Sequence, residues 1–399
     1  MTPRPVAARS APLTEARGTT GTARALAMRA LIELDRTNGR ANVIVPDLLA
    51  GCRLEERDRA FVTELVYGTV RMRRACDWLV DRHLRRPVEI HVRAALRLGA
   101  YQLAMLGTPA HAAVSATVAE VSGPARGLVN AILRRVAEEV SAPSALRWPS
   151  EAVRLSYPDW IVESLTSALG AADAIATLEQ MNVAARVTVR ADGYTQDLAS
   201  QWAAQAVEAS SGERIVDLCA APGGKATYLA GALPALVVAG DADTGRAAVM
   251  AENVQRLGLD NVATVVLDGT RPPFPPSVFD RVLVDAPCSG LGVLRRRPDA
   301  RWRIQPDDVA RLAVLQRKLL DQALTLVRPG GSVVYSVCTL TDAETTEIDQ
   351  WLATAHPDVS AVAPAVSEAW ARVGRGVRLL PPVAGTDGMF LLVLQRADG

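Results

Sequence analysis

The spacing of apolar residues changes near residue 180, and this change most restricts the folds open to the chain. From about residue 21 to 140, apolar side chains recur at positions i, i+3, i+4 and i+7, as in HVRAALRLGAYQLAML, which predicts helices throughout. After about residue 180, short Val-rich runs such as RIVDLCA and RVLVDA alternate with helical stretches. Strands that alternate with helices predict a mostly parallel sheet with helices on both faces.

These patterns divide the chain into four segments. Residues 1–20 are small, polar and Pro-containing, and we expect them to form a flexible tail. Residues 21–145 predict an all-α domain, and residues 146–180 predict a helical linker with several prolines. Residues 181–399 predict an α/β domain of the doubly wound, Rossmann-like type. Ligands of such domains bind beyond the carboxyl ends of the strands.

Charge is distributed unevenly between the two halves. Residues 1–150 carry 22 Arg and 14 acidic residues, a net charge of +8, whereas the remainder has a net charge of −7. A basic half indicates binding to a polyanion such as nucleic acid, with solvated helix faces as the alternative. Only two of the 44 basic residues are lysines. Lys225 in APGGKAT therefore stands out as a place that needs a compact ammonium group.

The cysteines restrict the cellular compartment and the chemistry. There are five of them, an odd number, without a CxxC pair or zinc-like spacing, and no signal peptide is recognisable. We expect free thiols, a reducing cytoplasm and no metal. Residues 99–119 lack charge, but their Gln, Pro, His and Ser make a poor membrane span. The expectation is a soluble, monomeric protein without a membrane segment.

A glycine-bearing loop, DLCAAPGGKAT, follows the first predicted strand. Glycines at a strand-to-helix turn let backbone N–H groups approach a ligand closely. Cys219 and Ala226 stand where a phosphate-binding P-loop needs Gly and Ser or Thr, which argues against a nucleoside triphosphatase. The second predicted strand ends in Asp241 and the third in Asp268, placed for ribose and adenine respectively. This combination predicts S-adenosylmethionine, an adenosine derivative without phosphates, as the cofactor.

Two cysteines follow adjacent predicted strands. The fourth strand runs into DAPC, which ends at Cys288, and the fifth into YSVC, which ends at Cys338. A lone strand cysteine is usually buried and inert, but two at adjacent strand ends favour methyl transfer to carbon. A thiolate that adds to C6 of cytosine makes C5 nucleophilic, and a base must then remove the C5 proton so that the thiol can leave. Asp285 is placed to hold the N3 and N4 edge of the base.

The motifs DLCAAPGGKAT, LVDAPCSGLGVLRRRPDARW and VVYSVCTL resemble the Nop/Sun family of RNA cytosine-C5 methyltransferases over residues 205–395. ELVYGTVR and GLVNAILRR resemble the NusB-like domain of the bacterial 16S rRNA branch of that family, called Sun or Fmu. The resemblance implies a cytosine in 16S rRNA as the target of an S-adenosylmethionine-dependent methylation. A tRNA substrate and a non-catalytic ribosome-assembly protein that binds RNA stay open as alternatives.

The family's residue roles carry over to matching positions. Cys338 would attack the base, Cys288 would assist product release, and Asp285 would hold the target base. The reverse assignment of the two thiols, used by DNA cytosine methyltransferases, stays open. Lys225 and the cofactor's sulfonium would favour the thiolate of Cys338. The residues expected to bind the cofactor are Cys219, Ala220, Ala221, Pro222, Gly223, Gly224, Lys225, Asp241, Asp268 and Asp285.

Two departures from the family pattern are evident. Val337 precedes the second cysteine, where the family usually has Thr. Within residues 185–201, only about five residues stand where relatives insert several dozen that form a small RNA-binding subdomain. The chain is therefore expected to lack most of that subdomain. The five arginines and Trp302 of residues 295–303 are expected to contact RNA, with a solvated loop as the alternative.

Overall fold

The computed structural model of the 399-residue chain describes residues 21–142 and 146–398. The tail expected at residues 1–20 lies outside the described residues. Two compact units divide the chain: the first ends at Tyr157 and includes Arg297–Asp299, and the second holds the other residues from Pro158 onward. None of the helices in the described ranges is long and apolar enough to cross a membrane.

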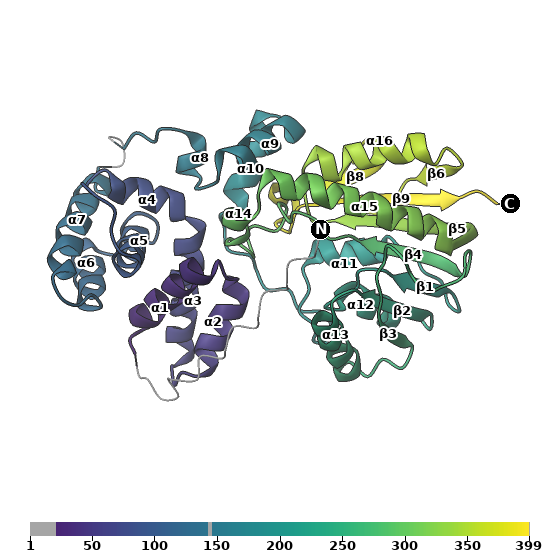
Figure 1. Cartoon of the computed structure of the whole chain (residues 1–399), viewed down its shortest axis with the longest axis horizontal. Helices are drawn as coiled ribbons and strands as arrows, with labels where there is room; N and C mark the ends of the chain where they lie inside the picture. Colours follow the sequence, from purple (N-terminus) through teal and green to yellow (C-terminus); the bar gives the residue numbers. More distant parts are fainter. Residues whose placement is uncertain (1–20, 143–145, 399) are drawn as a thin grey trace, which may run out of the picture. The chain divides into compact units, whose positions relative to one another are not determined.

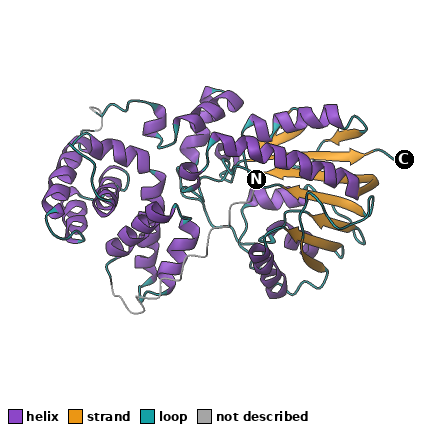
Figure 2. Cartoon of the chain, viewed as in Figure 1, coloured by secondary structure: helices purple, strands orange, loops and turns teal. Residues whose placement is uncertain are grey.

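The first unit consists of helices (Figure 2). Helix α5 (Ile90–Ala104) is buried along most of its length and packs against α1, α3, α4, α6 and α7. The predicted apolar stripes face this central helix, because residues three or four apart share one face. The remaining helices are α1 (Ala23–Thr37), α2 (Ala41–Ala50), α3 (Glu56–Arg71), α4 (Arg73–Asp81), α6 (Ala110–Ala119), α7 (Ala125–Val140) and α8 (Glu151–Arg154).

Glycines and one buried arginine determine how the helices meet α5. A Cβ on Gly68 of α3 would lie 2.0 Å from the Tyr101 hydroxyl, and a Cβ on Gly99 would lie 2.4 Å from Leu133. Arg97 donates to Asp35 of α1 at 2.6 Å and to Asp77 of α4 at 2.7 Å. Close backbone contact and a paired, buried charge therefore hold α5 at the centre of the unit.

The second unit contains a nine-stranded sheet of order β3-β2-β1-β4-β5-β9-β8-β7, with β6 also paired to β9 (Figure 1). Strands β1 to β5 are parallel, as predicted, and the last strand is antiparallel to β5. The strands are β1 (Arg214–Asp217), β2 (Leu236–Asp241), β3 (Val262–Val266), β4 (Phe279–Asp285), β5 (Val327–Val337), β6 (Val359–Val362), β7 (Ala371–Val373), β8 (Gly376–Leu379) and β9 (Met389–Arg396).

Helices cover both faces of this sheet. Val216, Val282 and Val284 point into a core shared with α15 (Pro306–Leu326) and α16 (Thr346–Ala355). Ile215 and Leu283 point to the other face, where they pack with α12 (Gly224–Ala232) and α13 (Thr244–Arg256). Alternate side chains are thus buried on opposite faces, which explains the continuous apolar runs. The other helices are α9 (Asp159–Leu169), α10 (Ala171–Gln180), α11 (Leu198–Gln205), α14 (Ala300–Arg303), α17 (Pro381–Ala384) and the 3₁₀ turn η2 (Asp342–Glu344).

The strand order changes direction between β1 and β4, and we call this switch point, where ligands of such sheets bind, the crevice. Chain order runs outward from this pair in both directions, so that the loops after β1 and β4 leave in opposite senses. Asp217 ends β1, Asp285 ends β4 and Val337 ends β5. The carboxyl ends of parallel strands lie on the same edge, so the glycine loop and both thiol-bearing loops meet there.

The contact between α3 and α5 makes a first prediction. The methyl group of Gly68→Ala would overlap the Tyr101 ring. Such overpacking lowers the free energy of unfolding by ~1–3 kcal/mol. We expect a lower melting temperature for the helical unit by circular dichroism. Gly127→Ala, in the exposed face of α7 where a Cβ meets nothing within 4 Å, is the control and should be neutral or slightly stabilising. Equal melting of Gly68→Ala and wild type would contradict this packing.

Candidate active site

The expected cofactor loop lies at the carboxyl end of β1. Cys219 to Pro222 form the turn, Gly223 adopts a positive φ of 102° as it enters α12, and Gly224 and Lys225 lie in the first helical turn. The Gly223 N–H donates to the carbonyl of Ala220 at 2.7 Å, which closes the turn. A side chain at Gly223 would be strained by this φ, so the loop needs a glycine here.

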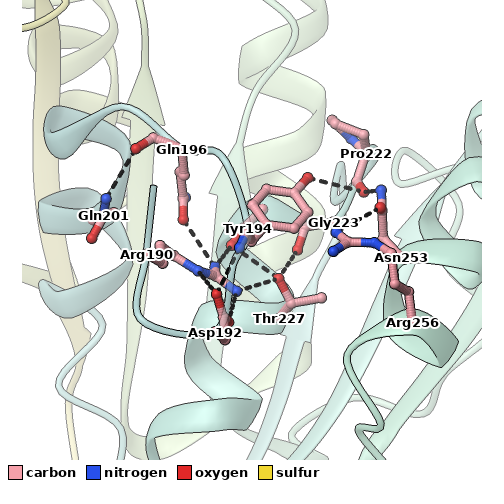
Figure 3. A network of polar contacts seen from close by, with 11 residues as sticks. Arg190, Asp192, Tyr194, Gln196, Gln201, Pro222, Gly223, Thr227, Asn253 and Arg256 are labelled. Carbon is pink, nitrogen blue, oxygen red and sulfur yellow. Dashed lines mark hydrogen bonds and ion pairs between the residues drawn. The ribbon is translucent and has the colours of Figure 1, made fainter. Parts of the chain in front are cut away.

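Side chains of a short hairpin contact this loop (Figure 3), and this hairpin stands where relatives are expected to have an additional subdomain. Val189 and Thr195 form an antiparallel bridge between its two arms, and the Gly193 N–H donates to the Arg190 carbonyl at 3.0 Å in its turn. The buried guanidinium of Arg190 donates to the Gly224 carbonyl at 2.8 Å and to the Thr227 hydroxyl at 3.2 Å. Its position is held by Gln196 at 2.9 Å and by stacking over the Tyr194 ring. The shortened segment thus still anchors the start of α12.

The two acids expected to hold the adenosine lie at the ends of neighbouring strands. Asp241 ends β2 and is 5% exposed. It accepts from the Asp243 N–H at 3.0 Å and pairs with Arg246 at 3.1 Å, while Arg246 also donates to the Ala221 carbonyl. Asp268 lies two residues past β3, which ends earlier than predicted at Val266. Arg246 therefore connects the second strand end with the cofactor loop.

Asp268 is exposed and held by its own turn. The hydroxyl and N–H of Thr270 donate to it at 2.7 and 2.9 Å, and these two hydrogen bonds hold the pKa of Asp268 below its ordinary value. The carboxylate is thus preorganised as an acceptor on the strand next to Asp241.

An ion pair between a buried lysine and a half-buried aspartate lies at the carboxyl ends of β4 and β5. The ammonium of Lys225 is 2.7 Å from the Asp285 carboxylate, which also accepts from the Ser336 hydroxyl at 3.1 Å. Burial would lower the pKa of Lys225, but the charge and hydrogen bond of Asp285 raise it above the ordinary value. Lys225 therefore stays charged although it is buried, and the pair joins α12 to β4 and β5.

Asp217, which the sequence reasoning missed, lies beside this pair at the end of β1. Its carboxyl is fully buried, and desolvation together with the nearby charge of Asp285 raises its pKa to about 8. One oxygen accepts from the Cys219 N–H at 3.2 Å, and the other has no hydrogen-bond partner among the described residues. Its position at a strand end, like that of Asp241, was the signal that could have identified it.

The two thiols expected to act together are adjacent. The Sγ atoms of Cys288 and Cys338 are 3.3 Å apart. Cys338 follows β5 directly, and the Cys288 loop returns to it through Gly292, whose N–H donates to the Cys338 carbonyl at 3.0 Å. A Cβ on Gly292 would lie 2.1 Å from the Gly388 carbonyl oxygen, so only glycine allows this approach.

The charges around the two sulfurs differ. The hydrogen bond with Cys338, burial and the negative charges of Cys338 and Glu344 raise the pKa of Cys288 well above its ordinary value. Cys338 instead lies near two cations. It raises the pKa of Lys225, although less than Asp285 does. It also raises the pKa of Arg296, although less than Asp387 and Asp197 do. Two cations thus lie near Cys338, whereas a carboxylate lies near Cys288.

Two of the five arginines in the segment 295–303 are buried, whereas Arg296 and Arg297 are exposed. Arg295 is buried and donates to the Thr386 carbonyl at 2.9 Å, and Arg301 is buried and donates to Asn182 at 2.9 Å. Arg296 pairs with the buried Asp387. The prediction of phosphate contacts is wrong for Arg295 and Arg301, because this loop folds back onto residues 385–387 and 182 rather than into solvent.

Comparison with known proteins adds independent information. Residues 204–395 match the family described as 16S rRNA methyltransferase RsmB/F, and residues 21–138 match the NusB family. The chain is 38% identical over 412 positions to the ribosomal RNA small subunit methyltransferase B of Thermus thermophilus, covering 95% of this chain and 98% of that protein.

Two further similarities concern length and fold. A protein of Mycobacterium tuberculosis named as a methyltransferase is 37% identical over 468 positions, covering 99% of this chain and all of the relative. Because this chain has 399 residues, that relative contains residues that have no counterpart here. The crystal structure of PH0851 shares the fold, with a TM-score of 0.74 at 21% identity over 93% of this chain and 99% of that one.

The Thermus relative is similar along almost the whole chain, and the family match covers the sheet and both thiol loops. The glycine loop and the strand-end acids lie at the carboxyl edge of the sheet, where ligands of such domains bind. The chain therefore belongs to the 16S rRNA methyltransferase RsmB/F family of S-adenosylmethionine-dependent enzymes and carries an N-terminal NusB domain.

Proposed function

We propose that this protein methylates C5 of a cytosine in 16S rRNA through a covalent bond between Cys338 and C6. The observation that carries the proposal is the 3.3 Å separation of two thiols beside the Lys225–Asp285 pair. Methylation of a nitrogen or oxygen atom needs no thiol, whereas C5 of cytosine needs activation by a nucleophile. The similarity to small-subunit rRNA methyltransferases favours 16S rRNA over tRNA, and two intact thiols favour an enzyme over a binding protein.

The residues around the crevice divide between cofactor and base. Cys219 to Lys225 would contact the methionine part of S-adenosylmethionine, Asp241 its ribose and Asp268 its adenine. The cofactor supplies an electrophilic methyl group when bound. Asp285 is 32% exposed in its side chain, enough to accept a hydrogen bond from N4 of a cytosine while Lys225 balances its charge. The target base must leave its stack to reach these groups, so an unpaired nucleotide is the cheaper substrate.

The two sulfurs would act in sequence. The thiolate of Cys338 adds to C6, and the C5–C6 electron pair then forms the bond from C5 to the methyl carbon. The bond from that carbon to the sulfonium sulfur would break at the same time, with its electrons left on the sulfur. Once the Cys338 sulfur is bonded to C6, its negative charge no longer raises the pKa of Cys288. Cys288 can then lose its proton to water and take the proton from C5. The C5–H electrons restore the C5–C6 double bond, and the electrons of the C6–S bond return to Cys338.

The helical unit would supply much of the RNA affinity. Its sequence has a net charge of +8 over residues 1–150, and the hairpin at residues 189–195 leaves little surface for a separate RNA-binding subdomain. We propose that residues 21–145 act as the RNA-binding domain and residues 181–399 as the catalytic domain. We further propose that the protein works as a monomer in the cytoplasm, where rRNA is transcribed.

The roles of the thiols can be separated by trapping. Each single mutant is incubated with 16S rRNA and S-adenosylmethionine and analysed by denaturing electrophoresis. Cys288→Ala should accumulate a covalent protein–RNA band, because attack and methyl transfer proceed but elimination stalls. Cys338→Ala should give neither a band nor methylation, since no sulfur attacks C6. The reverse pattern would exchange the two roles, and retained activity without a band in both mutants would refute covalent catalysis by these thiols.

Cofactor affinity tests the adenosine site. Asp241→Ala removes charge-assisted hydrogen bonds to ribose that are each worth roughly 1.5–3 kcal/mol, so the dissociation constant for S-adenosylmethionine should rise at least about tenfold. Isothermal calorimetry measures this constant directly. Asp260→Ala, an exposed acid just after α13, is the control. If both variants bind the cofactor as wild type does, the adenosine lies elsewhere.

Salt dependence tests the role of the helical unit. Four exposed arginines of this unit are replaced by glutamine together: Arg85, Arg86, Arg134 and Arg135. The slope of log affinity for 16S rRNA against log salt concentration should become less negative by up to roughly 3, because fewer counterions are released. The control replaces four exposed arginines of the second unit: Arg256, Arg271, Arg311 and Arg372. A larger loss of slope in the control would assign RNA binding to the second unit instead.

A further inference from the structure

Glu344 is a fully buried acid directly behind the two thiol loops. One carboxylate oxygen accepts from the Ser289 N–H at 2.8 Å and from the Gln316 amide at 3.1 Å. The other accepts from the hydroxyls of Ser289, Thr339 and Thr341 at 2.5, 3.1 and 2.9 Å. The donors are uncharged. Ser289 and Thr339 also contact each other with one hydroxyl hydrogen each, so at least four of the five hydrogen bonds to the carboxylate can form at once, as a buried carboxylate requires.

The donors belong to both thiol loops. Ser289 immediately follows Cys288, and Thr339 immediately follows Cys338. The hydroxyls of Ser289 and Thr339 also contact each other at 2.7 Å. One carboxylate therefore connects the residue after each cysteine, although the cysteines are 50 positions apart in sequence.

A second layer holds this carboxylate from α15 and β5. The Gln316 amide donates to the Pro287 carbonyl at 2.9 Å as well as to Glu344. The buried hydroxyl of Tyr335 contacts the Gln316 amide oxygen at 3.0 Å and the Glu344 carbonyl at 2.8 Å. Residues on both sides of Cys288 are thus tied to the network, which is rigid because every member is buried and bonded.

We propose that Glu344 is a positioning residue that holds the Cys288 and Cys338 loops at the sulfur separation needed for attack and release. This inference rests on the proposed covalent function, and it adds a residue that touches neither cofactor nor base. Loss of the carboxylate would leave several buried donors unpaired and let the two loops separate.

Glu344 also acts on Cys288 through its charge. The pKa of Cys288 is raised most by the hydrogen bond with Cys338, then by burial and by the charge of Cys338, and the charge of Glu344 raises it further. Replacing the carboxylate by an amide removes a negative charge and so favours the Cys288 thiolate. The alkylation rate of Cys288 should then rise at lower pH in Glu344→Gln than in wild type. A residue that only fills space would leave this pH profile unchanged.

The separation of the sulfurs can be measured without RNA. In a glutathione redox buffer, one oxidised glutathione converts the two thiols to one disulfide and is itself reduced to two glutathione molecules. The equilibrium constant is the effective concentration of one thiol at the other, and it falls when the loops move apart. The fraction oxidised is read by peptide mass spectrometry on the full-length protein, with Cys288→Ser to identify the peptide.

Glu344→Gln should lower this effective concentration and kcat by roughly 10- to 100-fold, with KM for RNA and the affinity for S-adenosylmethionine little changed. Glu347→Gln, exposed and three residues away, is the matched control. Ser289→Ala and Thr339→Val each remove one link and should give smaller losses of effective concentration, which keeps the test open if Glu344→Gln unfolds. Unchanged effective concentration in Glu344→Gln or, if it unfolds, in both single-link variants would overturn the inference.

Failure of the proposed function would look different. If wild type shows a high effective concentration that depends on Glu344 but forms no methylcytosine, the positioning role stands and the cytosine-C5 assignment falls. If wild type methylates cytosine and Glu344→Gln retains both kcat and thiol pairing, the function stands and Glu344 has no positioning role.

Discussion

Parallel pairing of β4 between β1 and β5 is the constraint on which the rest of the site depends. The register pairs Asp285 with Ser336, two residues before Cys338, and places Asp217 at the end of the next strand. One edge of the sheet therefore receives a buried acid, a lysine-paired acid and a thiol from three separate segments. A shift of one residue in β5 would turn Cys338 to the opposite face.

At this edge of the sheet, the two cysteines have neighbours of opposite charge. Lys225 and Arg296 lie near Cys338, whereas Glu344 lies behind Cys288. Under the proposed mechanism, this arrangement would give the two cysteines different tasks, with Cys338 as the attacking sulfur and Cys288 as the thiol that assists release. The hairpin anchored by Arg190 supports the cofactor side of the same crevice, although it is too short to form a separate RNA-binding module.

The sequence predicts the helical and α/β parts and the five parallel strands, because Val-rich runs and helical periods are strong local signals. Strands β6 to β8 were not predicted, since they have three or four residues each and β6 and β7 are half-exposed. Motifs at strand ends predict that the glycine loop, Asp285 and both thiols lie at one edge of the sheet, and the structure places them there. Glu344 was not predicted because two of its hydrogen-bond partners, Ser289 and Gln316, come from distant segments and leave no local signature, whereas Asp217 does have a signal in its position at a strand end. Arg295 was misjudged for the same reason, since its acceptors are about 90 residues away.

The central claim is that the sulfur of Cys338 attacks C6, and RNA that contains 5-fluorocytidine tests it directly in the wild-type enzyme. Fluorine replaces the C5 proton that must leave, so the adduct cannot be resolved and accumulates. Peptide mass spectrometry of the digested complex then shows which cysteine carries the methylated fluorocytidine. The account predicts this mass on the peptide that contains Cys338. Its presence on the peptide that contains Cys288, or the absence of any adduct while unsubstituted rRNA is methylated, would contradict it.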